Sequence, residues 1–441
     1  MKLTTRAWDP LYGRTDFSKY EYKLISLPEV QRLRGIRMCN INSLLVTGAS
    51  EISRFEHTLG VLRLTQEWIK YHIVSAEEAN DLTAAALLHD MQTGPFGHSL
   101  QYVLEENEVE GDFVHEDIAH GKKNHYHQDL IANASFAGRP FGADALLGSR
   151  WENVGELIKG KGRLGPLISG TMDLDNIDNV VRLAYHVGVA YQEDSKVAIT
   201  LARDMDVING ELSFSEATIP SIMRWIKIRG DLYKLLLLDW AEFSAKAMFT
   251  RAMEIAISKN ILGSNSWVHT DAELLTVLEK NGIGENQAVG DLVKRLRVGD
   301  LYRPIAMLQC AHINYYNDLN SPERKAEFES KITEYTKKTY NTKIKIIMHL
   351  ILDNGKTQRA VSLRLKESGE YQTLGRNSKK LLIGFFVSRN SLSDSNQRLL
   401  GIQINTMLNE YGITDLSDID DPMAEKQIDQ APPHDLQMNL I

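Results

Sequence analysis

Cysteine is scarce in this chain, with only Cys39 and Cys310 among 441 residues. Two isolated cysteines are too few for a disulfide framework or a thiolate metal site, and they are typical of proteins in a reducing compartment. The chain also lacks any run of about eighteen uncharged apolar residues, and residues 1–17 contain no apolar core of signal-peptide length. We therefore expect a cytoplasmic protein with no membrane partner.

Positive charge is not in excess either. The 50 Lys and Arg residues face 58 Asp and Glu residues, which gives a formal net charge of −8. This balance argues against non-specific nucleic-acid binding, but basic residues can still line one deep site, so a nucleic-acid partner stays open. With 43% hydrophobic residues, a chain of this length can bury a large core and form two or three domains.

Helical patterns dominate residues 25–260. The segments LPEVQRLRGIRM and RFEHTLGVLRLTQEWIKYHI place apolar residues at steps of three and four, which predicts amphipathic helices. Residues 218–259 continue this pattern, and Gly230 predicts a break within them. The glycine-rich residues 136–170 are typical of loops between short helices. These features predict a mainly α-helical protein.

The pattern changes after about residue 340. The segment KIKIIMHLILDNGKTQRAVSLRL contains two β-branched runs around Asp353, Asn354 and Gly355, which predicts a β-hairpin. KKLLIGFFVSR predicts a further strand, and NQRLLGIQINTMLNEYG a closing helix. From Ser417 the chain is acidic and contains prolines, which is typical of a mobile tail. We divide the chain into a helical domain (1–260), a helical connector (261–310), a C-terminal α/β segment (311–416) and the tail (417–441).

Histidine is unevenly distributed, since eight of the thirteen lie between residues 57 and 127. Most of these are best explained as solvated or satisfied core histidines. His57, the adjacent His89 and Asp90, and Asp175 form a different kind of set, with two imidazoles and two carboxylates near apolar helical segments. Such a mixed nitrogen and oxygen site suits Mn, Mg, Fe, Zn or Ni, and the residue types do not choose among them. The set predicts one divalent metal ion.

The order of these residues resembles the HD-domain phosphohydrolases. Six motifs narrow the resemblance to the deoxynucleoside triphosphate triphosphohydrolases, which include the bacterial dGTPases and a vertebrate enzyme with a sterile alpha motif. They are DPLYG (9–13), LPEVQRLRGIRM (27–38), TGASEISRFEHTLGV (47–61), LLHDMQTGPFGHS (87–99), VHED (114–117) and SGTMDLDNIDNVVRLAYHVG (169–188). The resemblance covers roughly residues 9–260, and it implies that residues 1–260 form an HD phosphohydrolase domain.

The resemblance implies roles for individual residues. His57, His89, Asp90 and Asp175 would bind the metal ion. Arg54 would contact substrate phosphates, because a guanidinium can clamp phosphate oxygens with two hydrogen bonds. His115 would lie near the α-phosphate. Lys227 and Arg229 on a later helix would either face the site or belong to a solvated helix face.

Two sets of positions depart from the family pattern. The family's usual general acid is a histidine supported by an aspartate, and Thr93 and Gln101 stand at those positions here. Either another histidine has taken the role (His115 first, then His98 or His120), or the enzyme cleaves a bond whose leaving group needs less help. The sugar and base pocket also differs, and the corresponding substrate-binding positions are Met38-Cys39, Asn176, Asn179 and Leu183.

These observations predict metal-dependent hydrolysis of a nucleotide, foremost of a deoxynucleoside triphosphate to nucleoside and tripolyphosphate. One alternative is a phosphoanhydride or phosphodiester hydrolase that acts on another nucleotide or a nucleic-acid end. The other is a nucleotide-sensing protein with little turnover. The resemblance further implies a homo-oligomer and an allosteric nucleotide.

Overall fold

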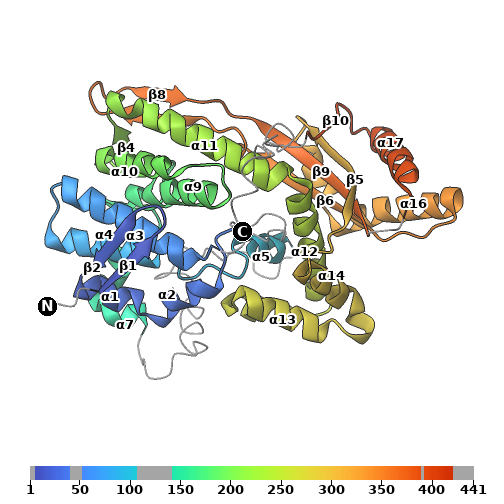
Figure 1. The fold of residues 1–441 in the computed structure, drawn as a ribbon, viewed down its shortest axis with the longest axis horizontal. Helices are drawn as coiled ribbons and strands as arrows, with labels where there is room; N and C mark the ends of the chain where they lie inside the picture. The colour runs from blue at the N-terminus through green and yellow to red at the C-terminus, as the bar shows by residue number, and fades with distance from the viewer. Residues whose placement is uncertain (1–4, 40–51, 107–141, 389–391, 421–441) are drawn as a thin grey trace, which may run out of the picture.

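The computed structural model describes residues 5–39, 52–106, 142–388 and 392–420. The fold is mainly α-helical, with small sheets in the C-terminal part, as the sequence predicts (Figure 1). Helices lie on one side of the molecule, a sheet with its own helices lies on the other, and α11 runs from the first group toward the second.

The first group contains the elements up to α11. Their bounds are β1 (Thr5–Asp9), β2 (Gly13–Phe17), α1 (Lys19–Ile25), α2 (Pro28–Arg32), α3 (Arg54–Tyr71), α4 (Ala76–Leu88), α5 (His98–Glu106), α7 (Ala143–Leu147), α8 (Trp151–Ile158), α9 (Leu174–His186), α10 (Ser195–Asp204), β3 (Asp206–Ile208), β4 (Glu211–Phe214) and α11 (Ile219–Leu238). Polar caps start the helices that matter most here. The side chains of Ser53, Ser75 and Asp173 accept a backbone N–H in the first turns of α3, α4 and α9.

The remaining elements follow α11 in the chain, and all of them except β7 and β8, which share a sheet with β3 and β4 beside the first group, form the second group. They are α12 (Trp240–Ser258), α13 (Asp271–Asn281), α14 (Gln287–Arg297), β5 (Arg303–Cys310), α15 (Tyr315–Leu319), α16 (Pro322–Tyr340), β6 (Ile346–Asn354), β7 (Val361–Leu365), β8 (Tyr371–Leu374), β9 (Lys379–Val387), α17 (Asp394–Glu410) and β10 (Ser417–Asp418). The strand predicted from KKLLIGFFVSR is β9, and the predicted closing helix is α17. Ser417 and Asp418 pair with β5, while residues 421–441 of the predicted tail lie outside the described residues.

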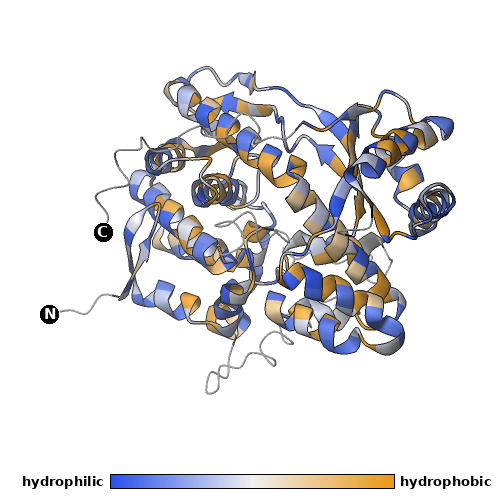
Figure 2. Cartoon of the chain, turned by 45° about the vertical axis from the view of Figure 1, so that its right-hand side comes forward, coloured by the Kyte–Doolittle hydropathy of each residue, from blue (hydrophilic) through white to orange (hydrophobic). Residues whose placement is uncertain are grey.

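The sheet β10-β5-β9-β6 is covered on both faces. Leu382 and Phe386 of β9 belong to the core beneath α12, whereas Leu381, Ile383 and Phe385 belong to the core beneath α16 and α17. Successive side chains of a strand point to opposite faces, so a strand buried on both faces is apolar throughout. Figure 2 shows the contrast with the helices, which carry hydrophobic and hydrophilic residues side by side.

The predicted hairpin around Asp353 is wrong. β6 pairs with β9, whereas β7 belongs to a second sheet, in the order β3-β4-β7-β8, where it runs parallel to β4. The Asp353 carboxylate accepts the backbone N–H groups of Lys356 and Thr357, and this compact loop redirects the chain instead of returning it along β6. Two β-branched runs around a turn thus define strands but not their partners.

The break predicted at Gly230 is also wrong. Helix α11 passes through this residue and ends at Leu238, where Asp239 caps α12 through the N–H groups of Ala241 and Glu242. A glycine inside a helix costs only about 1 kcal/mol relative to alanine, which packing along α11 can outweigh. The break therefore falls at the capping aspartate.

Candidate metal centre

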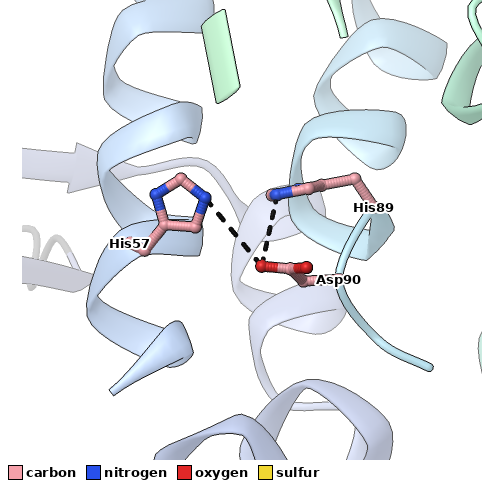
Figure 3. A group of neighbouring side chains, drawn as sticks. All are labelled: His57, His89 and Asp90. Carbon is pink, nitrogen blue, oxygen red and sulfur yellow. Dashed lines mark ion pairs between the residues drawn. The ribbon is translucent and has the colours of Figure 1, made fainter. Parts of the chain in front are cut away.

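Three helices bring the four predicted metal ligands together. His57 lies in the first turn of α3, His89 and Asp90 follow the end of α4, and Asp175 lies in the first turn of α9. His57, His89 and Asp90 are 0%, 7% and 4% exposed. Figure 3 shows both imidazoles directed toward the Asp90 carboxylate, and these three residues form a group able to hold a metal ion.

Four pairs of the proposed ligand atoms lie close enough to share an ion. Asp175 Oδ1 is 2.8 Å from His57 Nε2 and 3.7 Å from His89 Nε2. Asp90 Oδ2 is 3.9 Å from His57 Nε2 and 3.5 Å from His89 Nε2. Two donors that each lie about 2.1 Å from an ion can be at most about 4.2 Å apart, so each of these four pairs can share an ion.

His89 provides an independent test of the fit. Its Nδ1 is 2.9 Å from the Ala86 carbonyl oxygen, which can only accept, so Nδ1 carries the proton. Its Nε2 faces the carboxylates of Asp90 and Asp175 at 3.5 and 3.7 Å, and this buried atom has no hydrogen-bond partner among the described residues. A divalent ion between Nε2 and these two carboxylates would give the buried nitrogen a partner. The residues therefore fit a divalent metal ion.

A second layer of side chains fixes His57. Asp178 Oδ2 lies 2.7 Å from His57 Nδ1, and Arg182 donates to both oxygens of Asp178. Arg182 also pairs with Asp9, the first residue of the DPLYG motif. Burial alone would raise the pKa of Asp178, but Arg182 and His57 outweigh it and lower the pKa to about 2. A carboxylate behind a ligating histidine fixes its tautomer and raises its basicity.

The same network sets the charge of His57. Burial lowers its pKa, but hydrogen bonds to Asp175 and Asp178 outweigh burial and raise the pKa to about 9. In the metal-free protein the imidazole is thus protonated at neutral pH. Metal binding requires a neutral imidazole, so binding would release this proton.

Arg54 and Thr93 hold Asp90. Arg54 Nη1 donates to both Asp90 oxygens, at 2.7 and 2.8 Å, and Thr93 Oγ1 donates to Oδ1 at 2.8 Å. Desolvation by burial is opposed by Arg54, His89 and His57, which keep the pKa of Asp90 well below its usual range. Thr93, which replaces the family's acid, thus orients a proposed ligand. Arg54 also lines the cavity described next, and its predicted contact with phosphate stays a prediction.

A cavity of about 370 Å³ opens beside the metal centre. It brings together the predicted substrate-binding residues Arg54, Met38, Asn176 and Asn179 with His89, Asp90 and Asp175. Further lining residues were not predicted from the sequence, and they include Asp173, Tyr233, Glu242, Lys246 and Lys356. The volume lies within the usual range of small-molecule sites.

The structure does not place the side chains of the three histidines that the sequence offered as general acids. His115 and His120 lie outside the described residues, and His98 begins α5, but its side chain is not described. Lys227 is exposed and pairs with Asp231, as expected for a solvated helix face. Arg229 is buried and contacts the loop that follows β6.

Residues 267–269 and the side chain of Arg32 fix the loop that follows Asp90. Arg32 donates to the carbonyl oxygens of Thr93, Trp267, Val268 and His269, and Trp267 Nε1 donates to Gln92 O. These hydrogen bonds fix the backbone at Gln92 and Thr93, just after Asp90.

The fold and the metal centre define the class of protein. Residues 54–145 match the family model of the HD domain, a range that contains His57, His89 and Asp90 and ends before Asp175. The chain carries an HD domain and is similar to deoxynucleoside triphosphate triphosphohydrolases. In Dictyostelium discoideum, the deoxynucleoside triphosphate triphosphohydrolase SAMHD1 homolog is 23% identical over 67% of this chain and 59% of its own length.

A second curated relative is similar over a shorter range, and a solved structure shares the fold. The deoxynucleoside triphosphate triphosphohydrolase SAMHD1 of Mus musculus is 33% identical, over 20% of this chain and 15% of its own length. A phosphohydrolase structure from Bacteroides thetaiotaomicron has a TM-score of 0.63 at 19% identity, over 87% of this chain and 100% of that one. The chain spans less than two thirds of the length of these curated relatives. No helix in the described ranges is long and apolar enough to cross a membrane.

Proposed function

We propose that this protein hydrolyses a deoxynucleoside triphosphate to the deoxynucleoside and tripolyphosphate, with a divalent metal ion held by His57, His89, Asp90 and Asp175. The observation that carries the proposal is the group formed by His57, His89 and Asp90, beside a 370 Å³ cavity that His89, Asp90 and Asp175 line. When bound, the ion would polarise a phosphoryl oxygen and lower the pKa of a water molecule.

The charges around the cavity favour an anionic substrate once the ion is counted. The cations are Arg54, Lys246 and Lys356, and the carboxyl groups are Asp90, Asp173, Asp175 and Glu242. Burial and the nearby Asp175 raise the pKa of Asp173 to about 8, so this group is largely uncharged at neutral pH. A divalent ion then makes the lining net positive, which suits a polyphosphate.

The residues around the cavity would have three roles: to position the metal ligands, to contact phosphate, and to contact the sugar or base. Asp178 and Thr93 hold His57 and Asp90 in place, and Arg54 lies beside the same carboxylate, where it can meet a phosphate oxygen. Asn176 and Asn179 offer amide groups to the sugar or base from α9, and Met38 offers an apolar contact. A protein of this kind would also use nucleotide as an allosteric ligand and assemble into a homo-oligomer.

One observation favours a second candidate. The Thr93 hydroxyl is occupied by Asp90, so the position of the family's acid provides no proton for an alkoxide leaving group. A phosphoanhydride or phosphodiester hydrolase would not need that proton as much, and a nucleotide sensor would not need it at all.

Under the first proposal His115 supplies the proton to the leaving oxygen. His115→Asn should then lower kcat with metal affinity unchanged, whereas His98→Asn should leave kcat unchanged.

Product analysis separates these functions. The purified protein is incubated with each dNTP and NTP plus Mn²⁺ or Mg²⁺, and the products are resolved by chromatography. Tripolyphosphate and nucleoside support the first proposal, and pyrophosphate or phosphate supports the second. Asp90→Ala is the control, because it should abolish turnover and reduce metal content together. Absence of turnover with tight nucleotide binding would support the sensor.

A further inference from the structure

The loop after β6 carries a lysine into the cavity of the metal centre. Lys356 belongs to the C-terminal α/β segment, yet it lines the same cavity as His89 and Asp90. The loop is rigidly built, because Asp353 Oδ1 accepts the N–H groups of Lys356 at 2.7 Å and Thr357 at 3.2 Å. Thr357 Oγ1 donates to the other oxygen of this carboxylate. Asp353 thus shapes the loop.

Helix α11 holds this loop from the other side. Arg229 Nη1 donates to the carbonyl oxygens of Gly355 at 3.2 Å and Lys356 at 2.6 Å. A Cβ atom on Gly230 would lie 3.2 Å from Thr357 O, closer than most side-chain contacts, so this glycine permits the close approach of loop and helix. The arginine and the glycine together fix the backbone that presents Lys356.

The Lys356 ammonium group has no carboxylate within ion-pair distance in the part of the chain that the structure describes. Burial lowers the pKa of Lys356, and Arg229 adds to the effect, while Asp353 opposes it. A desolvated cation at a cavity wall is stabilised by an anion in the cavity. Lys246 of α12 lines the same cavity and adds a second positive charge.

We propose that Lys356 binds a phosphate group of the substrate beyond the one at the metal centre, so that the C-terminal α/β segment selects ligands with several phosphates. This inference rests on the proposed function for the position of the first phosphate. Arg54 and the metal ligands surround that position, whereas Lys356 comes from a separate element with no ion pair to Asp90 or Asp175. A lysine acts here as a point charge that can meet any phosphate oxygen.

The test compares the binding of two inorganic probes, tripolyphosphate and orthophosphate, by calorimetry in the presence of Mn²⁺. Lys356→Met should weaken tripolyphosphate binding by about tenfold, since a hydrogen bond to a charged group is lost. Orthophosphate binding should stay unchanged, because that probe occupies the metal centre alone. Lys356→Arg should keep most of the affinity for tripolyphosphate. Lys345→Met is the matched control, since Lys345 is exposed in the same segment.

Two results would overturn the proposal: unchanged tripolyphosphate binding, or an equal loss for both probes. Thermal denaturation of each variant identifies loss of folding, and if Lys356→Met does not fold, Lys356→Gln replaces it in the same comparison. Free tripolyphosphate and the triphosphate of a nucleotide are distinguished by repeating the titration with a dNTP in Ca²⁺ in place of Mn²⁺. None of these measurements requires turnover, so selective tripolyphosphate binding without nucleotide hydrolysis would contradict the proposed function and leave the role of Lys356 intact.

Discussion

Asp178 contacts His57 from behind and does not line the cavity, so its effect on the metal can be separated from its effect on substrate. Asp178→Asn removes the charge that makes Nδ1 a strong donor and takes from Arg182 one of its three carboxylate partners, which are Asp178, Glu56 and Asp9. We expect metal affinity to fall by about 10- to 100-fold, as for other partners of ligating histidines. Calorimetric titration of the metal-free protein with Mn²⁺ measures this loss.

Asp194→Asn is the control for this variant. Asp194 is 6% exposed and accepts from Arg224 at 2.7 and 2.8 Å, so it resembles Asp178 in burial and partner but lies away from the metal centre. Its loss should lower stability without changing metal affinity. Equal metal affinities of the two variants would show that Asp178 does not position His57.

His349 makes stability depend on pH. This residue is 7% exposed, its Nε2 has no partner among the described residues, and burial, followed by Lys246, Lys325 and Arg251, holds its pKa well below 6.5. Below about pH 6.5 the unfolded chain binds a proton that the folded protein excludes, so stability should fall by up to about 1.4 kcal/mol per pH unit. Above that pH this contribution is constant.

His349→Leu should therefore flatten the pH dependence of the urea midpoint between pH 7.5 and 5.5. The exposed His312 provides the comparison, because His312→Leu removes a histidine that pairs with Asp415 at the surface. If both variants keep the wild-type slope, burial of His349 does not govern acid stability.

At the scale of elements, the contact between α3 and α9 depends on a glycine. A Cβ atom on Gly60 would lie 2.2 Å from both Arg182 Nη2 and Asp178 Oδ1. Alanine is favoured over glycine in helices by about 1 kcal/mol, but here it should destabilise the protein by about 1–3 kcal/mol through overpacking. We expect Gly60→Ala to weaken metal binding as well, since it displaces the pair behind His57.

Gly401→Ala tests whether that loss is specific. Gly401 lies in α17, and its added Cβ would approach Ile305 O at 2.9 Å, far from any proposed ligand. Both variants should lower the urea midpoint, and only Gly60→Ala should lower Mn²⁺ affinity. A normal metal titration of Gly60→Ala would mean that α3 and α9 can separate without disturbing His57.

Periodicity predicted α3 well, because this helix has a buried apolar face and a serine cap, Ser53, that can be read locally. It could not assign the partner of β6, since strand pairing depends on distant segments. Asp178 could have been found from its spacing, three residues after Asp175 and four before Arg182, which places all three on one side of α9. No sequence spacing marks Lys356 as a residue of the site, because only the tertiary fold brings the loop after β6 to the metal centre.

At the scale of the whole molecule, the C-terminal segment completes the core of the first group of helices. Ser213 and Phe214 of β4 pair with Arg364 and Leu365 of β7, and Val361, Leu363 and Leu365 belong to the core that contains α3, α4 and α9. A chain that ends at residue 300 keeps every proposed metal ligand but loses this strand. We expect it to have a lower urea midpoint and to aggregate through the open edge of β4.

A chain that ends at residue 420 is the control, because it keeps all three sheets that the structure describes. Its urea midpoint should match that of the full chain. If the chain that ends at residue 300 were equally stable and monomeric by gel filtration, the pairing of β4 with β7 would contribute nothing to stability.

The parallel pairing of β4 with β7 also orders events during synthesis on the ribosome. All four proposed metal ligands have been made once residue 175 is added, so a nascent chain could acquire its ion early. The loop that carries Lys356 is made much later, and in the folded protein it contacts α11 just before the strand β7, which pairs with β4. Since nascent chains fold from the N-terminus, we expect metal binding to be gained before polyphosphate binding, and the last step of maturation to be the closing of the cavity.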